Sequence, residues 1–162
     1  MTGLWDAKVD RAPLLALTGQ VQVQVFGPGA FQDIDLHAAF APVARFSQPV
    51  LRDSKHAELM TLACKSAIVE RDVAHLIFPD NVQTVEANDT RASAPGGRLS
   101  SPAVQPDEAV LDDALALIGS SKRPIIIVGY GARDSMAQIT ELAERLHAPV
   151  LTTFKAKGQL PD

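Results

Sequence analysis

The sequence predicts an α/β protein made of two incomplete parallel-sheet αβ units, of the three-layer α/β/α type, joined by a linker rich in proline and glycine. Short apolar segments alternate with segments of helical periodicity in both halves of the 162-residue chain, and such alternation is typical of parallel sheets with right-handed crossovers. Residues 84–106 between the halves are rich in Pro, Gly, Ser, Ala and Asp, which is linker composition. The predicted parts are therefore residues 1–83, the linker 84–106 and residues 107–162.

The composition is that of a globular protein. Apolar residues make up 46% of the chain and charged residues 21%, close to the globular average. The net charge of −4 and the pI near 5.5 give no electrostatic reason to expect nucleic acid or an anionic membrane as a partner. No apolar run approaches the ~18 residues of a membrane span, and the N-terminus lacks a signal-peptide pattern. We therefore expect a cytoplasmic protein with no membrane span.

Residues 1–83 alternate between helical and extended patterns. The apolar run 13–18 predicts a central strand. The alternation in 21–25 predicts a half-exposed strand, and an extended loop is the alternative because Gly27-Pro28-Gly29 follows. The other expected elements are a helix over 4–11, a helix over 30–40, a strand over 43–46, a helix from Asp53 or Ser54 to Arg71, and a strand over 73–78. The side chains expected to be buried are those of Leu4, Trp5, Val9, Leu59, Leu62, Ala63, Cys64 and Ala67.

The least ambiguous stretch runs from Arg123 to Arg133. The apolar residues 125–128 predict a short strand buried on both faces. Gly129-Tyr130-Gly131 follows as a tight turn, and a helix is expected to open near Asp134. A strand, a glycine turn and a helix N-terminus together favour an anion, because free N–H groups and the helix dipole point at the turn. The neighbouring expected elements are a helix over 107–118, a helix over 134–147 and a strand over 148–153.

The glycine turn is not a complete dinucleotide fingerprint. Its third glycine would fall at residue 134, which is Asp, and Asp134 as a helix cap would disfavour a phosphate there. Arg133 partly offsets this effect, since a guanidinium group can bind a diphosphate with two hydrogen bonds. The alternative interpretation is that the glycines form a turn and nothing more.

Two further segments carry polar groups near the ends of expected elements. Thr152, Thr153 and Lys155 follow a strand parallel to 125–128, so we expect them at the same sheet edge as the glycine turn, where they could bind a ribose or a phosphate. The alternative is a solvated strand end with a surface lysine. Phe31 and Gln32 precede a helix, and without further context they would be a hydrophobic plug and a capping amide.

The histidines argue against a metal site, and the number of strands argues against two independent domains. The histidines, at positions 37, 56, 75 and 147, are not spaced as metal ligands, so no metal site is predicted. His75 lies inside an expected strand and should be a core or rim residue. Two or three strands per half bury too little surface for a comfortable independent domain.

Several segments, in chain order, carry a resemblance to a known family: 3–20, Gly27-x-Gly29-Ala30-Phe31-Gln32-Asp33, 73–82, Gly129-Tyr130-Gly131-Ala132-Arg133 and 152–158. They resemble thiamine-diphosphate-dependent 2-keto acid enzymes of the pyruvate oxidase and acetolactate synthase group. Asp33 stands where the family usually has Glu. Residues 1–83 look like the later part of the family's pyrimidine-binding domain, and residues 107–162 look like the first half of its central domain.

The resemblance implies roles for individual residues. Phe31 and Gln32 would line the thiamine site, with the amide near a 2-keto acid such as pyruvate. The residues that would contact FAD, if FAD is bound, are Gly129, Gly131, Ala132, Arg133, Thr152, Thr153 and Lys155. The family's activating glutamate and the Gly-Asp-Gly motif that holds Mg²⁺ and the diphosphate have no counterpart in this sequence. The resemblance therefore implies an internal fragment that is inactive by itself and that assembles as a homo-oligomer.

Two other classes of function stay open. One is a non-catalytic nucleotide-binding module, which the glycine turn could support, and its related variant is a family member whose central domain binds no flavin or binds an ADP-containing ligand instead. The other is a self-assembling α/β fragment, because incomplete sheets expose apolar faces and unpaired strand edges.

Overall fold

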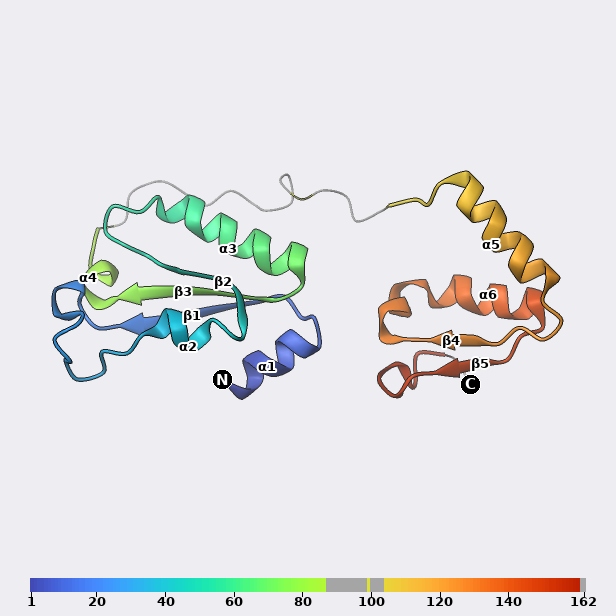
Figure 1. Ribbon diagram of the computed structural model, residues 1–162, viewed down its shortest axis with the longest axis horizontal. Coiled ribbons are helices and arrows are strands. Elements are labelled where there is room, and N and C mark those ends of the chain that lie inside the picture. Colours follow the sequence, from blue (N-terminus) through green and yellow to red (C-terminus); the bar gives the residue numbers. More distant parts are fainter. Residues whose placement is uncertain (87–98, 100–103, 161–162) are drawn as a thin grey trace. The chain divides into compact units, whose positions relative to one another are not determined.

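The computed structural model describes residues 1–86, 99 and 104–160. The chain divides into two compact units, Met1–Pro102 and Ala103–Asp162, called unit 1 and unit 2 below. Each unit contains a parallel sheet packed with helices (Figure 1), which confirms the α/β fold class. Most of the predicted linker 84–106 lies outside the described residues.

Unit 1 is a three-stranded parallel sheet whose strand order is β1-β3-β2. Its elements are α1 (Thr2–Val9), β1 (Leu14–Gln20), the 3-10 helix η1 (Val23–Val25), α2 (Leu36–Phe40), β2 (Ala44–Pro49), α3 (His56–Glu70), β3 (Val73–Pro79) and α4 (Asp80–Gln83). Leu14 of β1 and Ala44 of β2 both pair with Val73. The central strand is therefore β3, which is almost wholly buried and is apolar apart from His75, as is typical of a strand covered on both faces.

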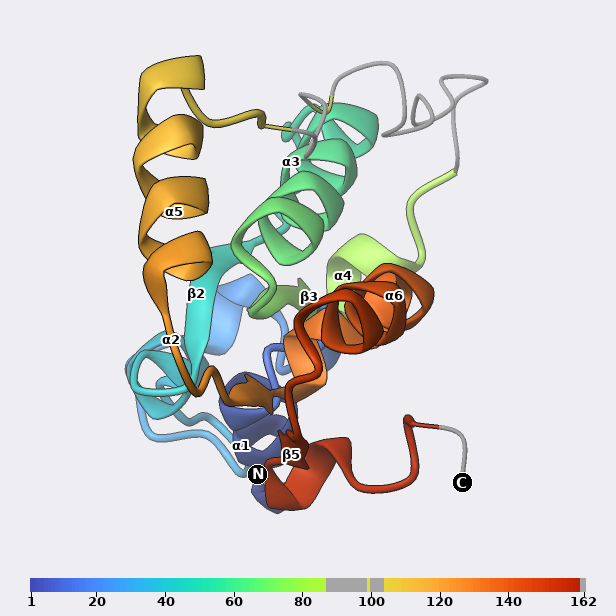
Figure 2. The same ribbon diagram turned by 90° about the vertical axis from the view of Figure 1, so that its right-hand side faces the viewer.

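Helices cover both faces of this sheet, so unit 1 has three layers. On one face α3 packs Ala63 and Ala67 against Ala74 and Leu76 of β3. On the other face Ala7 of α1 packs in a cluster with Val43 and Val73. Figure 1 and Figure 2 show α3 on one side of the strands and α1 and α2 on the other.

The structure corrects three predictions in unit 1. Strand 13–18 is not central, because β1 pairs with β3 alone in the described sheet. Residues 21–25 contain η1 and no strand, since the N–H of Val23 is held 3.1 Å from Oδ1 of Asn81. The helix expected over 30–40 is shorter and begins at Leu36, where Oδ1 of Asp35 accepts the N–H of Ala38 at 2.9 Å.

Burial in the helices of unit 1 also departs from expectation. Trp5 is 42% exposed and Val9 is 77% exposed, because α1 turns only its Ala7 side to the sheet. Leu62 is about half exposed and Cys64 is half-buried, whereas Ala63 is buried as predicted. Neither Asp53 nor Ser54 caps α3, whose N-cap is Lys55, and the Ser54 hydroxyl accepts the N–H of Leu51 instead.

Unit 2 contains a two-stranded parallel sheet in which Ile126 pairs with Val150. Its elements are α5 (Glu108–Ser120), β4 (Ile126–Val128), the 3-10 helix η3 (Tyr130–Ser135), α6 (Met136–Leu146), β5 (Val150–Thr152) and the 3-10 helix η4 (Phe154–Ala156). Asp107 caps α5 by accepting the N–H of Ala109. Across the described parts of both units, none of the helices has the length and apolar character that crossing a membrane requires.

Unit 2 differs from prediction in its burial and in its turn. Val128 is buried, but Ile127 is 70% exposed and Ile125 is also exposed, so β4 is covered on one face only. The helix expected over 107–118 is present as α5, but its apolar side chains Val110, Leu111 and Leu115 are exposed. The tight turn and immediate helix are replaced by η3, and α6 begins only at Met136.

Candidate functional site

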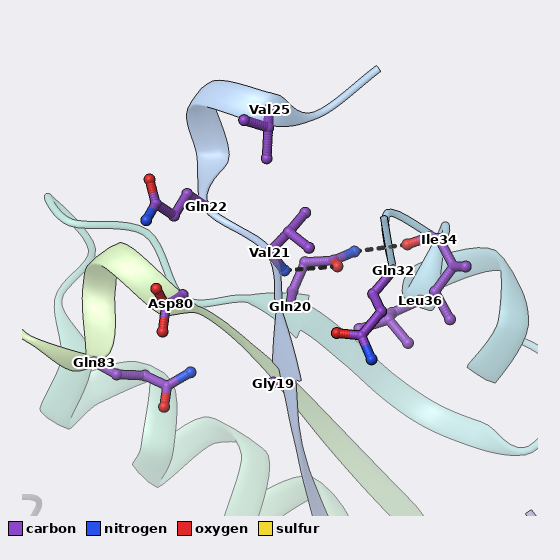
Figure 3. Close-up of a pocket in the computed structure, with 10 residues that line it drawn as sticks. All are labelled: Gly19, Gln20, Val21, Gln22, Val25, Gln32, Ile34, Leu36, Asp80 and Gln83. Carbon is purple, nitrogen blue, oxygen red and sulfur yellow. Dashed lines mark hydrogen bonds between the residues drawn. The ribbon is translucent and has the colours of Figure 1, made fainter. Parts of the chain in front are cut away.

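A pocket of about 920 Å³ lies at the carboxyl ends of β1 and β3 in unit 1. It forms here because parallel strands end at the same edge of a sheet and the connections that follow them rise above that edge. Its lining residues come from the end of β1, from the segment that leads through η1 to the start of α2, and from α4 (Figure 3): Gly19, Gln20, Val21, Gln22, Val25, Gln32, Ile34, Leu36, Asp80 and Gln83.

Side-chain amides hold the walls of this pocket together. Nε2 of Gln20 donates to the carbonyl of Ile34 at 2.6 Å, and Oε1 of the same side chain accepts the N–H of Val21 at 2.9 Å. Nε2 of Gln83 donates to the carbonyl of Phe78 at 3.0 Å. These bonds tie the loop before α2 to β1, and they tie α4 to β3.

Gln32 and Phe31 are neighbours in the same loop, but only Gln32 faces the pocket. Gln32 lines the pocket and has a φ of +66°, a left-handed conformation that is uncommon for a residue other than glycine. Phe31 is 89% exposed and is not among the lining residues, so it is not a hydrophobic plug. The loop that carries both is closed by Asp33, whose Oδ2 accepts the N–H of Gly27 at 2.9 Å.

Unit 2 brings its two polar segments to the same edge of its sheet, as the sequence predicts. The N–H of Thr153 donates to the carbonyl of Val128 at 2.8 Å, which joins the ends of the two strands. Cζ of Arg133 lies 5.1 Å and Nζ of Lys155 lies 4.8 Å from the centre of the Tyr130 ring. One aromatic ring is therefore in contact with two cations.

Gly129 and Gly131 of unit 2 leave the backbone between them accessible. Neither Gly129 nor Gly131 has a positive φ, and nothing described lies within 4 Å of the place that a Cβ atom would take in either residue. Conformation and packing therefore do not require glycine here, and its effect is to leave the backbone accessible. Asp134 does not cap α6, since the N-cap is Ser135, and its carboxylate pairs with Arg133 at 3.5 Å.

Sequence reasoning missed Gln20, Gln83 and Tyr130 as parts of these two sites. Gln20 ends β1 and Gln83 lies in the short helix directly after β3. The available signal was their position, because residues that follow parallel strands gather at one edge. Tyr130 was visible between the two glycines, but its contact with Lys155 depends on the pairing of β4 with β5.

His75 lies in the centre of the unit 1 sheet and is fully buried, which confirms that it is a core residue. Its Nε2 lies 2.8 Å from Oγ1 of Thr18 and its Nδ1 lies 2.9 Å from Oγ of Ser47. Its ring stacks on Phe40 with the ring centres 3.9 Å apart. Burial is the main cause that lowers the pKa of His75 below its ordinary value, and repulsion from His37 is the second cause. Among the described residues no group of three or more His, Cys, Asp or Glu side chains could hold a metal ion.

Known proteins resemble this chain along its whole length. Residues 111–162 match the family model of the thiamine pyrophosphate enzyme central domain. Acetolactate synthase isozyme 1 large subunit of Escherichia coli is 31% identical over 162 residues, covering 99% of this chain and 28% of that protein. Acetolactate synthase large subunit of Corynebacterium glutamicum is 30% identical and pyruvate oxidase of Lactiplantibacillus plantarum is 28% identical, each covering 100% of this chain. The chain spans 26% and 27% of the lengths of these last two.

Proposed function

We propose a function for this chain from the premise that it belongs to the thiamine pyrophosphate enzyme family, in the group resembling acetolactate synthase and pyruvate oxidase. The chain is proposed to be part of an enzyme that converts a 2-keto acid such as pyruvate. The cofactors of that enzyme would be thiamine diphosphate with Mg²⁺ and FAD, and it would act in the cytoplasm. The observation that carries the proposal is the amide-lined pocket at the carboxyl ends of β1 and β3.

The pocket fits the ring end of thiamine diphosphate and not its diphosphate end. Its polar lining is made of the four glutamine side chains, and among the ten lining residues Asp80 carries the one formal charge. Amides supply hydrogen-bond donors and acceptors to the uncharged aminopyrimidine ring, whereas a diphosphate needs cations or free backbone N–H groups. The diphosphate and Mg²⁺ would therefore be held by residues outside this chain.

Within this proposal the protein's part is to bind and to orient. When bound, thiamine diphosphate supplies the carbon nucleophile for attack on the keto carbon. The Gln32 amide would hydrogen-bond the keto acid, and Phe31 at the loop tip would help to exclude water. Gln20 fixes the Gln32 loop through the carbonyl of Ile34.

Unit 2 fits a ligand that combines an aromatic ring with phosphates, as FAD does. Gly129, Gly131 and Ala132 would let the ligand approach the backbone, and Arg133 and Lys155 would face the diphosphate across Tyr130. The hydroxyls of Thr152 and Thr153 would bind the ribityl or ribose groups. A flavin is preferred to a free phosphate because the Tyr130 ring is partly exposed beside the two cations and could stack on a ligand ring.

Binding measurements on the 162-residue chain test the two sites separately. Titration calorimetry should give similar affinities for thiamine and for thiamine diphosphate, since the pocket offers the diphosphate no cation, and Gln32→Ala should weaken both by about tenfold, equal to about 1.4 kcal/mol. Flavin fluorescence should report FAD binding that Arg133→Ala weakens by a similar factor, with Arg145→Ala as the control on the exposed side of α6. Failure of both ligands to bind would overturn the proposal.

We propose further that the isolated chain does not turn over keto acids. This proposal rests on its span of about 28% of the length of the first relative cited above. Carbon dioxide released from pyruvate by the chain with thiamine diphosphate and Mg²⁺, above a no-protein control, would contradict it.

A self-assembling module is the second candidate, because exposed apolar side chains line the two strands of unit 2. Ile127 of β4 and Leu151 of β5 are paired in register, and both are more than half exposed. A second copy could cover them. Light scattering during size-exclusion chromatography should then give a dimer mass that Ile127→Ser lowers to the monomer mass, whereas a monomer before substitution would exclude this candidate.

A further inference from the structure

We infer that His75 is a proton-sensitive latch beneath the unit 1 pocket, whose neutral ring joins β1, β2 and α2 and whose protonation releases α2. The inference does not depend on the ligand proposed above. It starts from the position of the ring, which contacts three different elements from the central strand.

The ring is held on every polar atom and on one face. Nε2 lies 2.8 Å from the hydroxyl of Thr18 on β1, and Nδ1 lies 2.9 Å from the hydroxyl of Ser47 on β2. The face of the ring stacks on Phe40, the last residue of α2, at 3.9 Å and with 13° between the planes. His75 therefore joins both outer strands and a short helix in one set of contacts.

This set of contacts suits the neutral ring and opposes the charged ring. A neutral imidazole has one donor and one acceptor nitrogen, and two hydroxyl groups can complement both. A protonated ring would donate from both nitrogens, so the hydroxyl that donates to the neutral ring would have to turn and accept. Within the described part of the chain the contacts of the ring include no carboxylate to balance the new charge, and a buried unpaired charge is strongly unfavourable.

The charged groups around this face of the sheet also disfavour protonation of His75. The titratable groups on the elements packed here are Asp35, the N-cap of α2, His37 of α2, Arg45 of β2, and Asp6 and Lys8 of α1, with Asp72 as the partner of Lys8. His37 acts against protonation of His75. The positive charge of Lys8 is already paired with Asp72 at 3.2 Å.

The latch lies directly below residues that shape the pocket. Thr18 is followed in β1 by Gly19 and Gln20, which line it. Leu36, at the start of α2, lines the same pocket. Because α2 has five residues and is too short to be stable alone, losing the stack on Phe40 would free the α2 side of the pocket before the rest of unit 1 unfolds.

The test follows the protonation of His75 and the opening of α2 in the same sample. Proton NMR of the 162-residue chain gives the pKa of each histidine ring, and amide hydrogen exchange gives the protection of α2 and α3, corrected for the intrinsic pH dependence of exchange. The pKa of His75 should lie below the ordinary value of a histidine. Below pH of about 6.5 the protection of α2 should fall about tenfold per pH unit until His75 itself is protonated, while α3 stays protected.

Two variants and one control separate the latch from general acid unfolding. His75→Gln cannot titrate, so the pH dependence of α2 protection should vanish. His37→Gln removes the repulsion, so the pKa of folded His75 should rise and the total loss of protection should shrink. His56→Gln should change neither. The inference is overturned if the protection of α2 in the unsubstituted chain does not depend on pH between 5 and 8, or if the protection of α3 is lost in step with that of α2. Both outcomes are measured on the unsubstituted chain, so neither depends on a variant that folds.

Discussion

The side-chain amide of Gln20 donates a 2.6 Å hydrogen bond to the carbonyl of Ile34 across the mouth of the unit 1 pocket. This bond ties the end of β1 to the loop that carries Gln32. In Gln20→Glu the carboxylate cannot donate, so it would repel the carbonyl of Ile34. We expect amides of residues 30–35 to exchange roughly 2–10-fold faster, the equivalent of about 0.5–1.5 kcal/mol for one hydrogen bond. Hydrogen exchange with mass spectrometry measures this.

The matched control for Gln20 is Gln22, which lines the same pocket. Gln22→Glu should leave exchange in residues 30–35 unchanged. Equal acceleration in both variants would mean that added negative charge, and not the lost donor, loosens the loop.

The ion pair between Lys8 and Asp72 predicts unequal effects of its two partners. Asp72 accepts from Nζ of Lys8 and also from the N–H of Val73 at 2.7 Å. Asp72→Ala should therefore lower the free energy of unfolding of unit 1 by about 1–3 kcal/mol, and Lys8→Met by less, because the methionine keeps the apolar stem. Urea unfolding followed by the fluorescence of Trp5, the one tryptophan of the chain, measures both.

The exposed pair Lys55–Glu58 is the control for this prediction. Its atoms are 3.8 Å apart and both side chains are more than half exposed. Glu58→Gln should change the free energy of unfolding by about 0.5 kcal/mol or less. A change as large as that of Asp72→Ala would contradict the view that burial decides the value of the pair.

Leu76 on β3 should be a major contributor to the stability of unit 1. It is 1% exposed and packs with Val50, Ala63 and Ala67. Leu76→Ala should lower the free energy of unfolding by about 2–5 kcal/mol, because it removes buried contacts and leaves a cavity. Leu62→Ala on α3, where the leucine is about half exposed, should lower it by about 1 kcal/mol or less in the same assay.

Arg71 ends α3 with a φ of +50°. An arginine is strained in this left-handed conformation and glycine is not. Arg71→Gly should raise the free energy of unfolding of unit 1 by about 0.5–1 kcal/mol. Lys65→Gly, on the exposed side of the same helix, should lower it by about 1 kcal/mol. A loss of stability in both variants would show that the Arg71 side chain contributes more than its strain removes.

The parts of the fold that sequence predicted well depend on local patterns. The run 73–78 is apolar apart from His75 and lies between a helix end and a proline, so β3 was expected almost to the residue. The pattern also placed α3 and α6, whose apolar residues repeat at helical spacing. These signals are local, because each depends on neighbours a few residues away.

The parts that sequence missed depend on distant contacts. Residues 21–25 alternate like a strand, but Val23 is held by Asn81 from beyond β3. The first strand is as apolar as a central strand and still lies at the edge of the described sheet. Gln20 and Gln83 meet at the pocket only because β1 pairs with β3. No local pattern encodes that pairing.

The strand order of unit 1 has a consequence for how the protein is made. β1 and β2 do not pair with each other, and both pair with β3, the last of the three in the chain. During synthesis on the ribosome the two outer strands emerge first, with no partner for their backbone hydrogen-bonding groups. The sheet can close only after Pro79 has left the exit tunnel, so until then both strands are unpaired and the apolar run at the start of β1 is exposed to chaperones.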